Sequence, residues 1–178
     1  MSQIALLRGV NLGGANRVAM VDVRAALEAA GFAAVRSLLQ SGNLVFEANR
    51  AEGAALEAQI ESALRERVSL KVDVMVRGAA AWRAMIEANP FPHQAETDPG
   101  RLVAVVLKTA PAEHAEAALA AVPGPEQSRV IGREAFIWYP AGQADTKLTG
   151  AILDRALGAR GTGRNWNTVL KLAALAGA

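Results

Sequence analysis

The sequence predicts an α+β fold with two small ferredoxin-like (split βαβ) sub-domains, of which the second is incomplete and ends in two helices. The composition is that of a globular protein, because apolar residues make up 52% of the 178 residues and charged residues 20%. The hydrophobic pattern switches repeatedly between the strand period and the helix period. In the first half of the chain the resulting order is β-α-β-β-α-β, which is the order of a split βαβ unit.

The first sub-domain is predicted over residues 1–77. Its second and third strands flank Ser41-Gly42-Asn43, a tight-turn sequence that predicts a hairpin. Its last strand alternates polar and apolar residues, which is typical of a half-buried strand. The predicted elements are a strand at 4–10, a helix from 20 to about 30, strands at 35–40 and 44–47, a helix at 51–68 and a strand at 71–76.

The second sub-domain is predicted over residues 78–178. Prolines at 90 and 92 end its first helix, and Pro123-Gly124-Pro125 ends its second. The predicted elements are a helix at 79–88, a strand at 102–107, a helix at 112–121, strands at 128–131 and 135–139, and helices at 148–157 and 165–175. The order β-α-β-β therefore recurs, but helices replace the final strand.

The composition excludes some classes of function and gives little support to others. The formal charge of +2 is too small to indicate nucleic-acid binding by itself, although residues from 141 onward carry five basic and two acidic side chains. The chain has no cysteine, which excludes disulfides and thiolate catalysis. His93 and His114 lack partners at metal-ligand spacing, so we expect ordinary surface histidines and no metal site.

The amino-terminal segment lacks the pattern of a secretory signal, and no apolar run approaches the length of a membrane-spanning helix. We therefore expect a cytoplasmic protein with no membrane partner. We also expect no cofactor. The sequence sets no expectation for the oligomeric state.

Polar residues concentrate in a few predicted loops and helix starts, and these are the candidates for a binding site. Glycine-rich turns and helix starts favour anions, because backbone N–H groups point at the ligand. Each motif also has a structural interpretation, as a strand-to-helix turn, a hairpin turn or a helix cap. The candidate ligand-binding residues are Arg8, Asn11, Gly13, Gly14, Asn16, Ser41, Asn43, Lys147, Thr149, Arg164, Asn165, Trp166 and Asn167.

The same motifs carry a resemblance to a known family. The segments LLRGVNLGG, QSGNLVF, NPFP, KLTGAILDRALG and RNWNTVLKL occur in family order along the chain. In these residues the chain resembles a large bacterial family of uncharacterised proteins, the domain of unknown function 1697. The resemblance implies two small α/β sub-domains and supplies no catalytic residue.

Our leading hypothesis is that the polar loops bind a phosphate-bearing ligand, either a nucleotide or a short nucleic acid. In this hypothesis Arg8 or Arg164 contacts phosphate and Trp166 stacks or packs. An alternative is an enzyme that acts on a small polar substrate between the sub-domains, with Lys147 or Asp145 as acid–base candidate. A further alternative is a structural or interaction protein whose motif residues form the seam between sub-domains. Enzymatic activity stays open, since no catalytic residue stands out.

Overall fold

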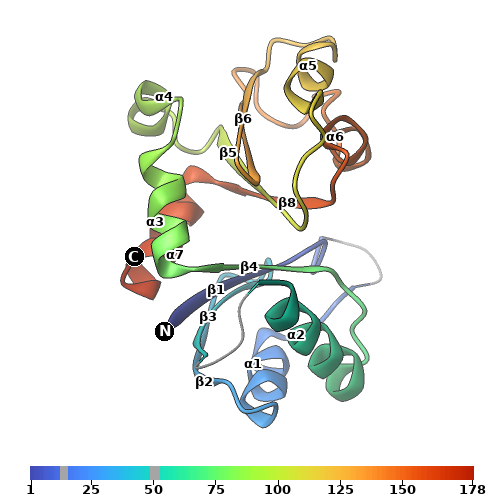
Figure 1. Cartoon of the computed structure of the whole chain (residues 1–178), viewed down its shortest axis with the longest axis vertical. Coiled ribbons are helices and arrows are strands. Elements are labelled where there is room, and N and C mark those ends of the chain that lie inside the picture. The colour runs from blue at the N-terminus through green and yellow to red at the C-terminus, as the bar shows by residue number, and fades with distance from the viewer. Residues whose placement is uncertain (13–15, 49–52) are drawn as a thin grey trace. The chain divides into compact units, whose positions relative to one another are not determined.

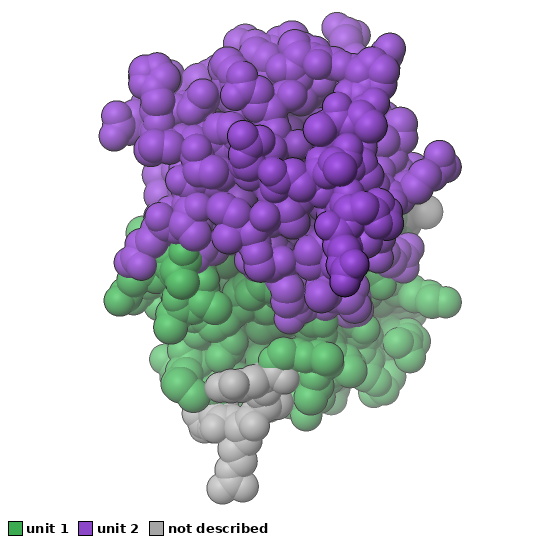
Figure 2. Space-filling view, turned by 45° about the horizontal axis from the view of Figure 1, so that its top comes forward, with its two compact units in different colours: residues 1–84, 171–178 green, residues 85–170 purple. Residues whose placement is uncertain are grey.

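The computed structural model describes residues 1–12, 16–48 and 53–178 (Figure 1). The chain divides into two compact units, coloured in Figure 2: unit 1 consists of residues 1–84 and 171–178, and unit 2 of residues 85–170. Each unit holds one four-stranded antiparallel sheet with helices between its strands. The predicted α+β class with two split βαβ sub-domains is thereby confirmed. A division into folding domains at residue 77 stays a prediction.

Unit 1 has the sheet order β2-β3-β1-β4. Its elements are β1 (Ser2–Leu7), α1 (Met20–Ala29), β2 (Ala33–Leu38), β3 (Asn43–Glu47), α2 (Gly53–Val68) and β4 (Val74–Gly78). Helices α1 and α2 contact each other, and their apolar faces pack against the sheet. The fully buried residues of this core include Leu7, Leu27, Phe46, Ile60 and Leu64.

The predicted hairpin between β2 and β3 depends on a glycine. Gly42 has a φ of +75°, and a Cβ there would lie 2.5 Å from Val10 Cγ2 and 2.7 Å from Leu7 Cβ. The turn therefore packs directly on the end of β1, where no side chain fits. The Gly42 carbonyl accepts a hydrogen bond of 2.8 Å from the Leu7 N–H.

Unit 2 repeats the topology with the sheet order β6-β7-β5-β8. Its elements are α4 (Pro92–Thr97), β5 (Leu102–Leu107), α5 (Ala115–Ala120), β6 (Gln127–Ile131), β7 (Glu134–Trp138), α6 (Gly150–Leu157) and β8 (Gly161–Asn165). Helices α5 and α6 contact each other and cover a core that contains Val105, Leu107, Ile137, Tyr139 and Leu157. Two further helices, α3 (Ala79–Glu87) and α7 (Trp166–Ala176), each contain residues of both units.

Strand β8 corrects the prediction that the second sub-domain is incomplete. It pairs antiparallel with β5, in a register that places Gly163 opposite Val105. The segment lacks the alternation of a strand, because two of its five residues are glycines. The glycines are required by packing: a Cβ on Gly161 would lie 2.8 Å from the side chains of Leu107 and Val105. A strand that needs glycine for close approach has the composition of a loop.

The segment after α3 also differs from the prediction in part. The predicted helix stop is present, since α3 ends at Glu87. The next residues form the short helix α4 with Pro92 in its first turn, a position where proline loses no hydrogen bond. Phe91 is buried, and its N–H donates to Asn89 Oδ1 at 3.0 Å.

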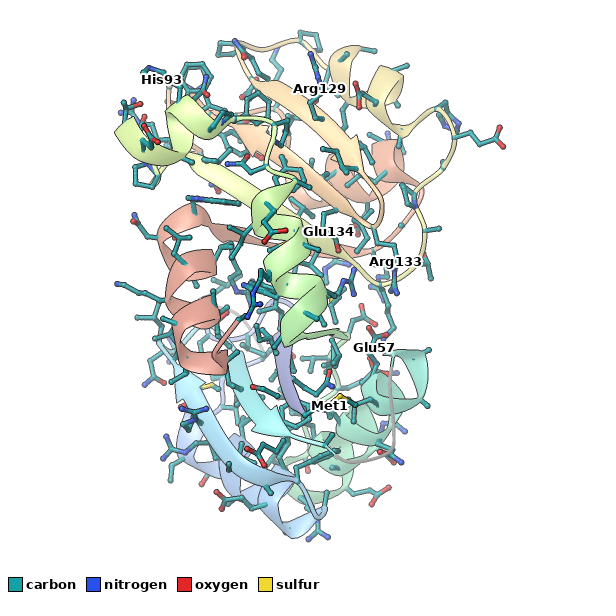
Figure 3. All side chains as sticks on the ribbon, turned by 60° about the vertical axis from the view of Figure 1, so that its left-hand side comes forward. Met1, Glu57, His93, Arg129, Arg133 and Glu134 are labelled. Carbon is teal, nitrogen blue, oxygen red and sulfur yellow. The ribbon has the colours of Figure 1, made fainter. Side chains whose placement is uncertain are left out.

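In each sheet, one edge strand donates backbone hydrogen bonds to a helix carboxylate. In unit 1, Glu57 and Glu61 of α2 accept hydrogen bonds from the Val76 and Val74 N–H groups of edge strand β4, at 3.0 and 2.9 Å. In unit 2, Glu116 of α5 accepts one from the Val130 N–H of edge strand β6 at 2.9 Å. Figure 3 labels Glu57 and also Arg129, whose Nε lies 3.9 Å from Glu116 Oε1. No helix in the described part of the chain is long and apolar enough to span a membrane.

Candidate functional site

The loop after β1 is closed by the side chain of Asn11. Its Nδ2 donates to the carbonyls of Val18, at 2.9 Å, and Gln40, at 2.7 Å, and its Oδ1 accepts from the Val18 N–H at 3.0 Å. The Asn11 N–H donates to the Asn16 carbonyl at 2.9 Å. Asn11 therefore ties its loop together and joins it to the hairpin turn. The candidates Gly13 and Gly14 lie outside the described residues.

The remaining candidates of unit 1 also make contacts within that unit. Asn43 is fully buried, and its Nδ2 donates to the Leu38 carbonyl at 2.9 Å and to Ser41 Oγ at 3.0 Å, which holds the hairpin turn. Arg8 Nη1 lies 4.0 Å from Asp73 Oδ2, and the Arg8 N–H donates to the Asp73 carbonyl at 3.0 Å. These contacts connect β1 to its neighbours and are structural in character.

In unit 2, Arg164 belongs to β8, and its side chain forms hydrogen bonds to residues of the same strand. Its Nη1 donates to Thr162 Oγ1 and to the Gly163 carbonyl, both at 2.8 Å. Burial lowers the pKa of Arg164 to about 10, so the guanidinium stays charged at neutral pH.

The two residues that follow Arg164 start the last helix. Asn165 is the N-cap of α7, because its Oδ1 accepts from the N–H and the hydroxyl of Thr168, at 3.0 and 2.9 Å. The Trp166 side chain is only 3% exposed, and its ring centroid lies 6.4 Å from that of Phe136. Trp166 is thus a buried side chain and offers no free face to a base. Asn167 is exposed on the first turn of α7.

Lys147 and Thr149 line a cavity. This groove lies between α5 and α6 within unit 2 and has a volume of about 660 Å³. Its polar lining, formed by His114, Lys147, Thr149 and Arg155, is exposed. Its apolar lining is formed by Ala118, Ala121, Val122, Pro123, Ile152 and Ala156. We refer to this cavity as the α5–α6 groove.

Helical spacing explains why these side chains share one groove. On α6, Ile152 is followed by Arg155 and Ala156 three and four residues later, which places all three on one face. His114 and Ala118 stand four residues apart at the start of α5. Alanines on both helices leave the hollow between them. The C-terminal end of α6 is fixed by the Ala112 N–H, which donates to the Leu157 carbonyl at 2.8 Å.

The loop that carries Lys147 is anchored on both sides. The Thr146 hydroxyl is hydrogen-bonded to the Glu126 carboxylate and accepts from the Leu148 N–H at 3.1 Å. Leu148 itself is buried, whereas Lys147 between them is exposed. The loop therefore presents the Lys147 ammonium to solvent at the groove.

The start of α6 adds favourable electrostatics for an anion. Thr149 is its N-cap residue, and the Leu153 N–H donates to the Thr149 carbonyl at 2.8 Å. The Thr149 hydroxyl makes no capping hydrogen bond to the helix. The helix start carries a partial positive charge. Among the described lining residues, Lys147 and Arg155 are charged and none is acidic.

The corresponding position in unit 1 has a different character. A groove of about 610 Å³ lies between α1 and α2 and is lined by Arg17, Asp22 and Arg67 among others. Here an acidic side chain stands among the basic ones, and Arg67 Nη2 donates to the Ala29 carbonyl at the end of α1, at 3.1 Å. The positive charge of the basic side chains in this groove is therefore partly balanced by the negative charge of Asp22.

The sequence interpretation did not include His114 or Arg155 among the binding residues. Arg155 was visible as part of the basic carboxyl-terminal segment, and its spacing from Ile152 on a predicted helix is the signal that connects it to Lys147. For His114 the sequence predicts an ordinary surface histidine. It is exposed, and it reaches the groove because α5 begins directly after it.

Comparison with known proteins places the chain in a family. Residues 1–136 match the family described as protein of unknown function (DUF1697). The chain belongs to the DUF1697 family. The match includes α5 and ends before α6, so it covers one side of the α5–α6 groove. No curated protein matches this DUF1697 chain.

A solved structure shares the fold. The DUF1697 chain is similar to the conserved bacterial protein SP0830 from Streptococcus pneumoniae, with a TM-score of 0.77 and 19% sequence identity. The similarity covers 99% of this chain and 98% of the other. At this identity the likeness concerns the fold.

Proposed function

We propose that this protein binds a small phosphate-bearing ligand in the α5–α6 groove of unit 2. The observation that carries the proposal is the composition of the groove lining, which brings Lys147, Arg155 and Thr149 to one cavity without an acidic residue. Lys147 and Arg155 supply charge, and the Thr149 hydroxyl supplies a neutral donor. A cavity of about 660 Å³ lies within the range of about 300–1,000 Å³ that is usual for small-molecule sites.

The proposal narrows the hypothesis drawn from the sequence. A nucleic acid binds through several phosphate contacts, whereas the groove offers two cations. Trp166, which in that hypothesis stacks or packs, is buried beside Phe136, so it supports packing and not stacking on a base. A ligand with one phosphate group fits these residues better than a polymer does.

The binding test uses the purified full chain and a panel of phosphate monoesters together with inorganic phosphate. A ligand present at 100 times its dissociation constant raises the free energy of unfolding by about 2.7 kcal/mol, which a thermal unfolding experiment detects. Titration calorimetry then gives the dissociation constant. We expect Lys147→Ala and Arg155→Ala each to weaken binding by about fivefold or more, since charged hydrogen bonds contribute about 1 kcal/mol or more.

A matched control is available on α2. Arg65 is exposed and lies outside the α5–α6 groove, so Arg65→Ala removes the same charge without touching the site. We expect Arg65→Ala to bind as the unaltered protein does. The proposal would be contradicted if the Lys147→Ala/Arg155→Ala double variant bound the ligand as tightly as the unaltered protein does. It would also be contradicted if Arg65→Ala weakened binding as much as the groove variants do.

A further inference from the structure

We infer that the ligand of the α5–α6 groove is amphipathic, with one phosphate headgroup joined to an apolar chain, and that it is a small molecule in solution. This inference rests on the proposed function, because it describes the rest of the ligand whose phosphate that function assigns to Lys147 and Arg155.

The buried part of the lining is apolar, whereas the exposed part holds all of the polar side chains together with Ala121 and Pro123. The side chains of His114, Lys147, Thr149 and Arg155 are all exposed. Ala118, Val122 and Ile152 are partly buried and pack against the core of unit 2. A bound molecule therefore meets charge at the mouth of the groove and apolar surface at its floor.

The floor is poorly suited to a nucleoside. Base edges carry donors and acceptors that lose their water on binding, and an unpaired polar group is costly to bury. Alanine, valine and isoleucine side chains cannot pair with them. The described lining also contains no phenylalanine, tyrosine or tryptophan on which a base could stack.

An apolar chain, in contrast, gains from the same surface. Each buried methylene contributes about 0.8 kcal/mol, which corresponds to about a fourfold change in affinity. The groove is open on one side, so we expect about a two- to fourfold gain for each methylene until the chain exceeds the floor. The exposed cations complement a phosphate held at the mouth.

The experiment titrates the full chain with inorganic phosphate and with butyl, hexyl and octyl phosphate, each below its micelle concentration. We expect affinity to rise along this series, with octyl phosphate at least about tenfold tighter than butyl phosphate. Octanol serves as the neutral counterpart. We expect it to bind far more weakly than octyl phosphate.

Two neighbouring alanines provide a matched pair of variants. Ala121 lines the groove and is exposed, so Ala121→Phe places a bulky ring against the groove without replacing a core residue. Ala120 is also exposed and is not among the residues that line the groove. We expect Ala121→Phe to abolish the gain from chain length and Ala120→Phe to retain it.

The outcomes separate this inference from the function on which it rests. Equal affinities for butyl and octyl phosphate, with binding still lost in the Lys147→Ala/Arg155→Ala double variant, would overturn the inference and leave the proposed function in place. Octanol binding as tightly as octyl phosphate would overturn both, because the phosphate would then contribute nothing. Binding to vesicles of phosphatidylglycerol and phosphatidylcholine, without binding to monomeric octyl phosphate, would overturn the assignment to a small molecule.

Discussion

Asn165 accepts two hydrogen bonds from Thr168 at the start of α7, and this geometry gives a residue-scale test of its role. We expect Asn165→Ala to lower the free energy of unfolding by about 1 kcal/mol, because the N–H and the hydroxyl of Thr168 lose their acceptor. Asn165→Asp should retain most of the stability. Urea denaturation measures both. If Asn165→Ala kept normal stability but lost binding of phosphate esters, Asn165 would instead be a ligand-binding residue.

Tyr139 gives a second residue-scale prediction, for alkaline pH. Burial, together with the negative charge of Glu126, raises the pKa of Tyr139 from 10.0 to about 12 in the folded protein. The neutral phenol is thus favoured by folding, so this stabilisation is complete below pH 10 and is lost as the pH rises from 10 to 12. We expect a loss of about 1–3 kcal/mol over that window.

The control for this prediction is Tyr139→Phe. Arg164 titrates in the opposite sense, since its pKa is lowered to about 10, but that contribution is common to both proteins and cancels in their difference. Urea denaturation at pH 8 and pH 11 supplies the comparison. A difference in stability between the two proteins that stays constant from pH 8 to pH 11 would refute the assignment.

At the scale of elements, the carboxylates on the sheet edges give the clearest prediction. Glu57 is buried and accepts the Val76 N–H, so β4 does not present this donor to another chain. We expect Glu57→Leu to cost about 1–3 kcal/mol, because the N–H loses this acceptor. Light scattering should also show increased aggregation. Glu57→Gln keeps an acceptor oxygen and should behave nearly as the unaltered protein; similar losses in both variants would argue against edge protection.

The elements also show what the sequence could and could not predict of the fold. Segments with a clear period, such as the buried strand β5 and helix α2, were predicted, because burial itself creates the pattern. Strand β8 was missed, because close packing against Val105 and Leu107 selects glycine there. Helix α4 was missed because six residues are too few to show a helical period.

At the scale of the whole molecule, the candidate site was predicted only in part. The sequence singles out polar motifs, but the side chains of Asn11 and Asn165 form hydrogen bonds within their own loops and helix starts. Lys147 and Thr149 differ from them because they line a cavity. Lys147 and Thr149 line a groove because α5 and α6 pack side by side, and a single sequence does not reveal that packing.

Unit 1 is discontinuous along the chain, and this has a consequence for synthesis on the ribosome. Residues 171–178 belong to unit 1, yet the 94 residues from 85 to 178 are translated after its first segment ends. At about 5–20 residues per second, the first segment waits roughly 5–20 s for them. Unit 2, in contrast, is contiguous and is fully translated before residues 171–178 are added. The part of the protein that is made first is therefore the last to be completed.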